Sequence, residues 1–279
     1  MSAEDVPGAT EQLNVDGEPI SMADLVAQTA RDPALRRIET GWRGLDWLLG
    51  GGFPTGIAYL LMSPPGGGKT TLLIMLLRAL ACLKVGCLYV QTEETQKQLG
   101  VRFARLGVFP KTHFRVVQER NLDSIIQLFE RERPRIAAVD SLHRLEGVTD
   151  SNDFQCSTGS PSAVEIGAST LRDYATSVNM TLIAVAHSTK GGDVAGCNSL
   201  IHDMDATLFL DGKLVSIGGR QVIRGKDRLL SSKGKNRYAN EDRRVHLEMR
   251  DDGIFDMGVW TEERPPWEPQ APPNIVIAR

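Results

Sequence analysis

Short apolar runs alternate with longer amphipathic segments through the middle of the chain. Four runs have the length and composition of strands buried on both faces of a sheet: 57–62, 87–91, 136–140 and 181–186. Three segments have apolar positions at helical spacing or a helix-forming composition: 70–83, 122–133 and 163–178. This alternation predicts an α/β fold, in which helices cover both faces of a mostly parallel sheet.

The pattern changes towards both ends of the chain. From about Ala206 onward, short strands joined by glycine turns predict an antiparallel extension of the sheet. Residues 1–33 are acidic and poor in aromatics, so we expect a weakly ordered arm, with one helix over 21–30. Residues 262–279 contain five prolines, which predicts an extended tail. The folded domain is therefore expected to span 34–261.

Composition excludes several classes of protein. The 279 residues are 41% hydrophobic and 24% charged, enough for one large domain with tails. The longest apolar stretch is interrupted by Arg78 and Lys84 and is too short to cross a bilayer, so no membrane partner is expected. The four cysteines are widely spaced and no leader pattern precedes them, which favours reduced thiols in a cytoplasmic protein.

Charge is unevenly distributed, although the formal net charge is only −3. Residues 213–237 contain one acidic side chain, Asp227, and eight basic ones: Lys213, Arg220, Arg224, Lys226, Arg228, Lys233, Lys235 and Arg237. Such a segment is either a surface for a polyanion or a solvated ribbon of surface strands.

A glycine-rich turn between the first strand and the first long helix predicts a phosphate-binding loop. It consists of Ser63, Pro64, Pro65, Gly66, Gly67, Gly68, Lys69, Thr70 and Thr71. Glycines let successive N–H groups face one centre, and the helix N-terminus attracts anions. We expect Lys69 to contact the β- and γ-phosphates of ATP and the Thr70 hydroxyl to bind Mg²⁺. Ser63 replaces the usual first glycine of GxxxxGK[ST].

Polar residues at the ends of later strands predict the rest of an active site, because carboxyl ends of parallel strands face the ligand. Glu93 and Glu94 follow the strand 87–91, and either carboxylate can orient and deprotonate water. Asp140 ends the next buried strand, the expected place for a carboxylate that holds Mg²⁺. His187 ends the strand 181–186 and is expected to contact the γ-phosphate.

Motifs spread over residues 34–258 match one known family in their order along the chain. They are the lead-in at 37–52, YVQTEET at 89–95, VDS at 139–141, TGS at 158–160, AHSTK at 186–190 followed by Ala195-Gly196, and KNRYA at 235–239. Together they resemble the RadA (Sms) family of bacterial DNA-repair ATPases, which have a RecA-like core. The resemblance implies that Glu93 is the water-activating residue.

The resemblance also implies an assembly and a DNA path. In a RecA-like ring, such as a hexamer, or in a filament, ATP lies between subunits, and Lys235 and Arg237 would act on the ATP of the neighbour. Single-stranded or branched DNA would pass along the loops 146–161 and 189–199, with contacts from Ser160, Lys190, Gly191 and Gly192.

Three departures from the family pattern limit what carries over. No cysteine precedes Cys82, so the family's four-cysteine zinc finger is not expected, and only the proline-rich tail follows the core in place of a Lon-like domain. Tyr238-Ala239 stands where the family signature ends Phe-Gly.

The sequence therefore favours a DNA-dependent ATPase motor acting in recombination, repair or replication. A replicative helicase of the DnaB type shares the same core and is one alternative. A RecA-like regulatory ATPase switch with protein partners, resembling the circadian-clock and gas-vesicle relatives, is the other.

Overall fold

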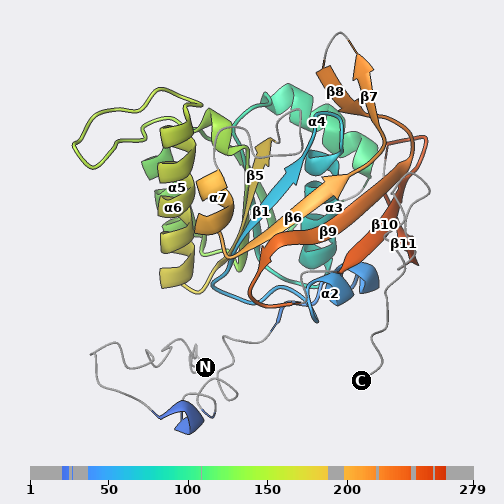
Figure 1. Cartoon of the computed structure of the whole chain (residues 1–279), viewed down its shortest axis with the longest axis horizontal. Helices are drawn as coiled ribbons and strands as arrows, with labels where there is room; N and C mark the ends of the chain where they lie inside the picture. The colour runs from blue at the N-terminus through green and yellow to red at the C-terminus, as the bar shows by residue number, and fades with distance from the viewer. Residues whose placement is uncertain are drawn as a thin grey trace, which may run out of the picture.

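A nine-stranded sheet with helices on both faces forms the centre of the chain (Figure 1). The computed structural model describes residues 21–24, 27, 37–107, 109–187, 198–217, 220–239, 243–253 and 255–261. Parallel pairing joins, in spatial order, β3 (Phe114–Gln118), β2 (Cys87–Gln91), β4 (Ile136–Asp140), β5 (Thr181–His187), β1 (Ala58–Ser63) and β6 (Ala206–Asp211). Antiparallel pairing adds β9 (Asp227–Asn236), β10 (Arg244–Met249) and β11 (Phe255–Thr261).

Other elements connect or cover these strands. The helices are α2 (Arg43–Leu48), α3 (Lys69–Cys82), α4 (Gln96–Leu106), α5 (Leu122–Glu132), η2 (Leu142–Arg144), α6 (Pro161–Ser177) and α7 (Asn198–Asp203). A separate hairpin of β7 (Leu214–Ile217) and β8 (Arg220–Ile223) projects beyond the main sheet before the chain enters β9 (Figure 1).

Two hydrophobic cores lie on opposite faces of the sheet, and the period of two along β1 divides its side chains between them. Tyr59 and Leu61 pack in the core formed with α2, α3 and α4. Leu60 and Met62 pack in the core formed with α5, α6 and α7. Because both faces are covered, β1 is buried along its whole length, which explains its continuous apolar sequence.

The predicted fold class is confirmed. The strands 87–91 and 136–140 have the predicted bounds, and the other predicted elements agree within two residues. The antiparallel extension beyond Ala206 is also present. The sequence pattern missed the short helices α2 and α7, and it also missed α4 and β3. Both lie towards the edge of the sheet, where Val101 and Val116 are exposed, so neither segment has the continuous apolar pattern of a buried element.

Little of the predicted arm and none of the predicted tail lies within the described residues. Of the helix expected over 21–30, residues 22–24 and 27 are helical, and the Ser21 hydroxyl accepts a hydrogen bond from the Asp24 N–H. The domain limits at 34 and 261 stay predictions. Among the residues described, no helix combines the length and apolar character that crossing a membrane requires.

Strand register brings the predicted site residues to one edge of the sheet. Ser63 at the end of β1 pairs with His187 at the end of β5, and Asp140 at the end of β4 pairs with Gln91 at the end of β2. We call this the carboxyl edge of the sheet.

Candidate active site

The phosphate-binding loop connects β1 to α3 and depends on its glycines. Gly66 and Gly68 have φ angles of +78° and +98°, which other residues rarely adopt. A Cβ atom on Gly67 would lie 1.7 Å from the Ser63 Oγ atom. Three consecutive glycines are therefore needed for this backbone path, whereas Ser63 itself is accommodated as a fully buried residue.

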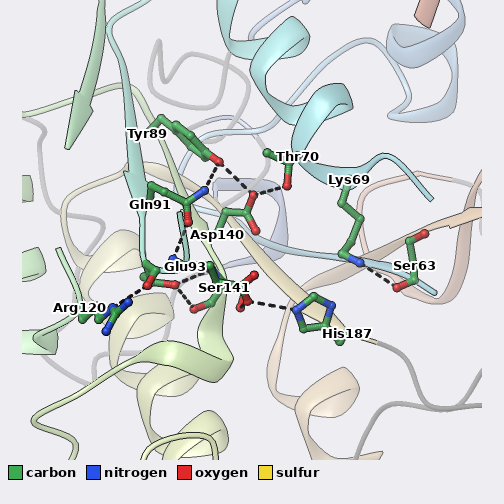
Figure 2. A network of polar contacts seen from close by, with 11 residues as sticks. Ser63, Lys69, Thr70, Tyr89, Gln91, Glu93, Arg120, Asp140, Ser141 and His187 are labelled. Atoms are coloured by element: carbon green, nitrogen blue, oxygen red, sulfur yellow. Dashed lines mark hydrogen bonds and ion pairs between the residues drawn. The ribbon is translucent and has the colours of Figure 1, made fainter. Parts of the chain in front are cut away.

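Lys69 begins α3 and folds back over the loop. Its Nζ donates a 2.8 Å hydrogen bond to the Ser63 carbonyl oxygen (Figure 2). Burial lowers the pKa of Lys69 to about 8, while the charges of Asp140 and Glu93 act in the opposite direction. A buried ammonium group beside a helix N-terminus is electrostatically costly, and an anion bound at the loop would offset that cost.

Asp140 and Thr70 meet at the end of β4. Asp140 Oδ2 accepts hydrogen bonds from the Thr70 hydroxyl at 2.7 Å and from the Tyr89 hydroxyl at 3.0 Å. Burial raises the pKa of Asp140, although both hydrogen bonds stabilise its ionised form. A carboxylate and a hydroxyl are oxygen ligands of the type that Mg²⁺ binds in nucleotide sites, so these two side chains fit a magnesium ion.

Glu93, at the same carboxyl edge as Asp140, has two polar partners. Its Oε1 accepts from the Ser141 hydroxyl and lies 3.1 Å from His187 Nε2 (Figure 2). The hydrogen bond from His187 and then that from Ser141 lower the pKa of Glu93 to about 2, against the effect of burial. Glu94 instead pairs with Arg102 of α4. Of the two adjacent carboxylates, only Glu93 contacts the residues at the carboxyl edge.

A second set of polar groups holds Glu93 and Asp140 in place. Gln91 donates to the Tyr89 hydroxyl at 2.9 Å and accepts from the Glu93 N–H at 2.7 Å (Figure 2). The Thr92 hydroxyl bridges the carbonyl oxygen and the N–H of Ser141, whose peptide bond with Asp140 is cis. Sequence reasoning missed these residues. A buried glutamine two positions after a tyrosine on the same strand face was the available signal.

The ring of His143, in η2, lies beside the ring of His187, with 5.2 Å between the two centroids. Burial, together with the neighbouring His187, lowers the pKa of His143 to about 4. A neutral His143 ring therefore packs beside His187 at neutral pH.

The comparisons with known proteins agree with this geometry. A family model described as an AAA domain matches residues 28–193, which is more than half of the chain. The chain belongs to this AAA domain family. The matched region includes the phosphate-binding loop, Glu93, Asp140 and His187.

Several curated relatives of this AAA domain protein carry the name DNA repair protein RadA. The protein from Haemophilus influenzae is 37% identical over 177 residues, which cover 63% of this chain and 37% of the relative. The protein from Escherichia coli is 35% identical over 178 residues, covering 64% and 37%. The protein from Listeria monocytogenes is 30% identical over 256 residues, covering 90% and 52%. The resemblance to RadA is confirmed, and the chain spans about half or less of the length of these relatives.

Lys235 and Arg237 of the AAA domain protein lie far from the other predicted catalytic residues. They flank Asn236, which pairs with Ala206, which in turn pairs with Tyr59 near the start of β1. Tyr59 and Ser63 are separated by roughly 13 Å of extended strand. The two cations therefore lie at the opposite edge of the sheet, which we call the amino edge.

Both cations contact acceptors on their own chain at this amino edge. The Lys235 Nζ donates to the carbonyl oxygen of His202 in α7. Arg237 is 62% exposed, and its Nη1 lies 3.7 Å from Asp205 Oδ1. The structure brings neither cation to the phosphate-binding loop of the same chain.

The predicted DNA contacts are only partly within the described residues. The Ser160 hydroxyl accepts a 3.2 Å hydrogen bond from the Ala163 N–H and caps α6. Lys190, Gly191 and Gly192 lie outside the described residues.

Both sequence interpretations placed the whole basic segment 213–237 at the surface, but the structure buries part of it. Lys226 is exposed and pairs with Asp251, whereas Arg228 is buried with only 3% exposed. The expectation was wrong for Arg228, because its guanidinium packs under the phosphate-binding loop, where it donates to the Gly67 carbonyl oxygen.

Proposed function

We propose that this protein is a magnesium-dependent ATP hydrolase, a DNA-dependent motor that acts on single-stranded or branched DNA in recombination, repair or replication. The observation that carries the proposal is the group of four side chains at the carboxyl edge. Lys69, the pair Thr70 and Asp140, and Glu93 come from three separate parts of the sequence and lie together beside a glycine loop of phosphate-binding geometry. This combination supplies the cation, metal ligands and base that phosphoryl transfer to water requires.

Each residue has a separate task in this proposal. Lys69 and the loop amides bind the phosphates, and Thr70 and Asp140 hold Mg²⁺, which neutralises charge developing on the phosphate oxygens. Glu93 orients the attacking water and accepts its proton. A pKa of about 2 makes Glu93 a weak base as long as His187 and Ser141 donate to it. Movement of His187 away from Glu93 would raise that pKa and free His187 for the γ-phosphate.

Lys235 and Arg237 are assigned to the neighbouring subunit's ATP. Their position at the amino edge supports this assignment, because the same chain's phosphate-binding loop lies at the carboxyl edge. An assembly that brings an amino edge against a carboxyl edge, as a ring or a filament does, would complete the site. The DNA repair role is proposed from the names of the RadA relatives.

The direct test is ATP hydrolysis by the purified protein with and without single-stranded DNA. We expect stimulation by DNA that decreases steeply as salt increases, because the loop 146–161 offers few side chains that read bases and binding would depend on phosphate contacts. Heparin at equal charge concentration is the control for a non-specific polyanion effect. Hydrolysis without any DNA stimulation would instead favour the regulatory switch with protein partners.

A second measurement separates the motor from the DnaB-type helicase, which shares the core. Displacement of a labelled strand from a forked duplex, measured with ATP and with a non-hydrolysable analogue, would identify a helicase. DNA-stimulated hydrolysis without displacement would favour a recombination mediator.

A further inference from the structure

The turn that connects β8 to β9, residues 223–228, contacts the phosphate-binding loop directly, and we call it the β8–β9 turn. The N–H of Ile223 donates a 3.2 Å hydrogen bond to the Pro65 carbonyl oxygen. The Nε–H of Arg228 donates a 2.9 Å hydrogen bond to the Gly67 carbonyl oxygen. Two alternate carbonyl groups of the loop are therefore held by one segment that follows them by about 160 residues along the chain.

Planarity of the peptide bond converts these contacts into an orientation of the loop amides. In a trans peptide, the carbonyl group and the N–H of the next residue point in opposite directions. The N–H groups of Gly66 and Gly68 are therefore directed away from the β8–β9 turn. Within the described part of the chain, neither N–H has a protein acceptor. The Gly68 amide thus joins the first amides of α3, which have no acceptors within their helix.

Arg228 is an unusual residue to bury for structural reasons alone. Its Nη1 donates to the carbonyl oxygens of Gly225 at 2.9 Å and Asp227 at 2.8 Å, so all its oxygen acceptors are backbone groups. Among the described residues no carboxylate is paired with it. An unpaired buried cation costs folding free energy, and a well-packed apolar side chain of similar length usually costs less.

Packing beneath the loop leaves little freedom for other arrangements. A Cβ atom on Gly68 would lie 2.7 Å from the Met249 Cε atom and 3.1 Å from the Phe255 ring. A Cβ atom on Gly67 would lie 3.2 Å from the Ile223 side chain. Ile223, Met249 and Phe255 thus pack against the three glycines of the loop.

We propose that Arg228 is a positioning residue for nucleotide binding: its hydrogen bond to Gly67 turns the Gly67–Gly68 peptide so that the Gly68 N–H faces the phosphates. The proposal rests on the proposed function, since it names how that same site is pre-formed. Arg228 lies outside residues 28–193, the region that the AAA domain model matches.

The test compares Arg228→Met, Arg228→Lys and the matched control Lys226→Met, which removes an exposed cation from the same turn. Four quantities are measured: the equilibrium affinity for a fluorescent ADP analogue, the melting temperature without nucleotide, and KM and kcat for ATP hydrolysis. For Arg228→Met we expect about tenfold weaker ADP binding, a KM raised by a similar factor, a nearly unchanged kcat, and a melting temperature within about 3 °C of wild type. Arg228→Lys keeps one donor and should bind ADP within about threefold of wild type. Lys226→Met should match wild type throughout.

The outcomes that overturn the proposal differ from those that overturn the function. If wild type binds the ADP analogue and Arg228→Met binds it within twofold, the positioning role is wrong while the nucleotide site stands. If Arg228→Met loses stability well beyond about 3 °C together with affinity, and Arg228→Lys recovers the two in parallel, the loss of affinity follows from the loss of stability, the residue is structural and the positioning role is again wrong. If wild type does not bind the ADP analogue at all, the proposed function fails and this inference fails with it.

Discussion

The carboxyl and amino edges of the same sheet carry catalytic candidates in opposite ways. At the carboxyl edge, the polar side chains bond to one another: Asp140, which is 4% exposed, accepts from Thr70 and Tyr89, and the partly exposed Glu93 and His187 contact each other. At the amino edge, the Arg237 side chain is 62% exposed, and its Nη1 lies 3.7 Å from Asp205 Oδ1. The first region is built to hold its geometry, whereas the second is free to meet another surface.

This difference separates the side chains that one chain positions by itself from the cations that are proposed to act on a neighbour's ATP. Buried hydrogen-bonded groups keep their positions because leaving any one unpaired costs free energy. An exposed arginine loses little when it exchanges its partner for another. In the proposed function, the carboxyl edge is the half of the site that one chain forms by itself, and Arg237 at the amino edge acts on the site of a neighbour. Each of the following experiments challenges one side of that contrast.

The largest effect is expected from Lys69→Ala, which removes the cation of the carboxyl edge. Hydrolysis should fall by at least about 10³-fold, because the ammonium group contributes charge to the phosphates during transfer. Circular dichroism and the melting temperature should show an intact fold, since the side chain contributes little to either core. Turnover at the wild-type rate in the Lys69→Ala protein would reject the nucleotide site.

Arg237→Ala tests the amino edge in the same assay. ATP affinity should stay nearly normal, whereas kcat should fall by about 10³-fold, the range for a cation supplied by a neighbour. Mixing this protein with Lys69→Ala protein should restore part of the activity, because a mixed interface can pair an intact loop with an intact Arg237.

Two controls make the mixing experiment decisive. Sedimentation must show that both variants assemble, because failed assembly would also prevent complementation. Properly assembled mixtures that stay inactive would mean that Arg237 does not act across an interface, and the contrast between the two edges would lose its functional meaning.

Glu93→Gln sharpens the assignment within the carboxyl edge. The variant should bind ATP but hydrolyse it about 100-fold more slowly, because an amide cannot accept the proton of water. Glu94→Gln is the matched control and should change the rate by less than about threefold, since Glu94 pairs with Arg102 and not with the site. A larger loss in Glu94→Gln than in Glu93→Gln would exchange the two roles.

A smaller effect is expected in the pH dependence of stability without nucleotide. The pKa of Lys69 is about 8 in the folded protein and has a reference value of 10.5. Between these values the unfolded chain binds more protons, so the free energy of unfolding should rise with pH relative to a Lys69→Met variant, by roughly 3 kcal/mol. The difference between the two proteins should be flat from pH 6 to 7. If urea titrations show a constant difference in the free energy of unfolding between the two proteins up to pH 10.5, burial does not lower the pKa of Lys69.

Local and strand-end features of the site were predictable from sequence. The loop 63–71 follows from its own glycines, because the phosphate-binding conformation requires backbone angles that only glycine adopts freely. The contact between Thr70 and Asp140, 70 residues apart, follows from the rule that parallel strands end at a common edge. Among the elements that the pattern missed, α4 and β3 lie towards an edge of the sheet and lack a continuous apolar run.

By itself, the sequence determined the buried strands and the long helices between them, the phosphate-binding loop and the strand ends that approach it, since these depend on local spacing and on buried apolar runs. The family resemblance already implied Glu93 and not Glu94, but only the tertiary structure showed that Glu94 pairs with Arg102, which belongs to a helix without a clear apolar pattern. Only the tertiary structure distinguished the buried Arg228 from the seven other basic residues of its segment, among them the exposed Arg237. A side chain's burial and partners depend on which distant segments pack against it, and a charge in the sequence does not specify that packing.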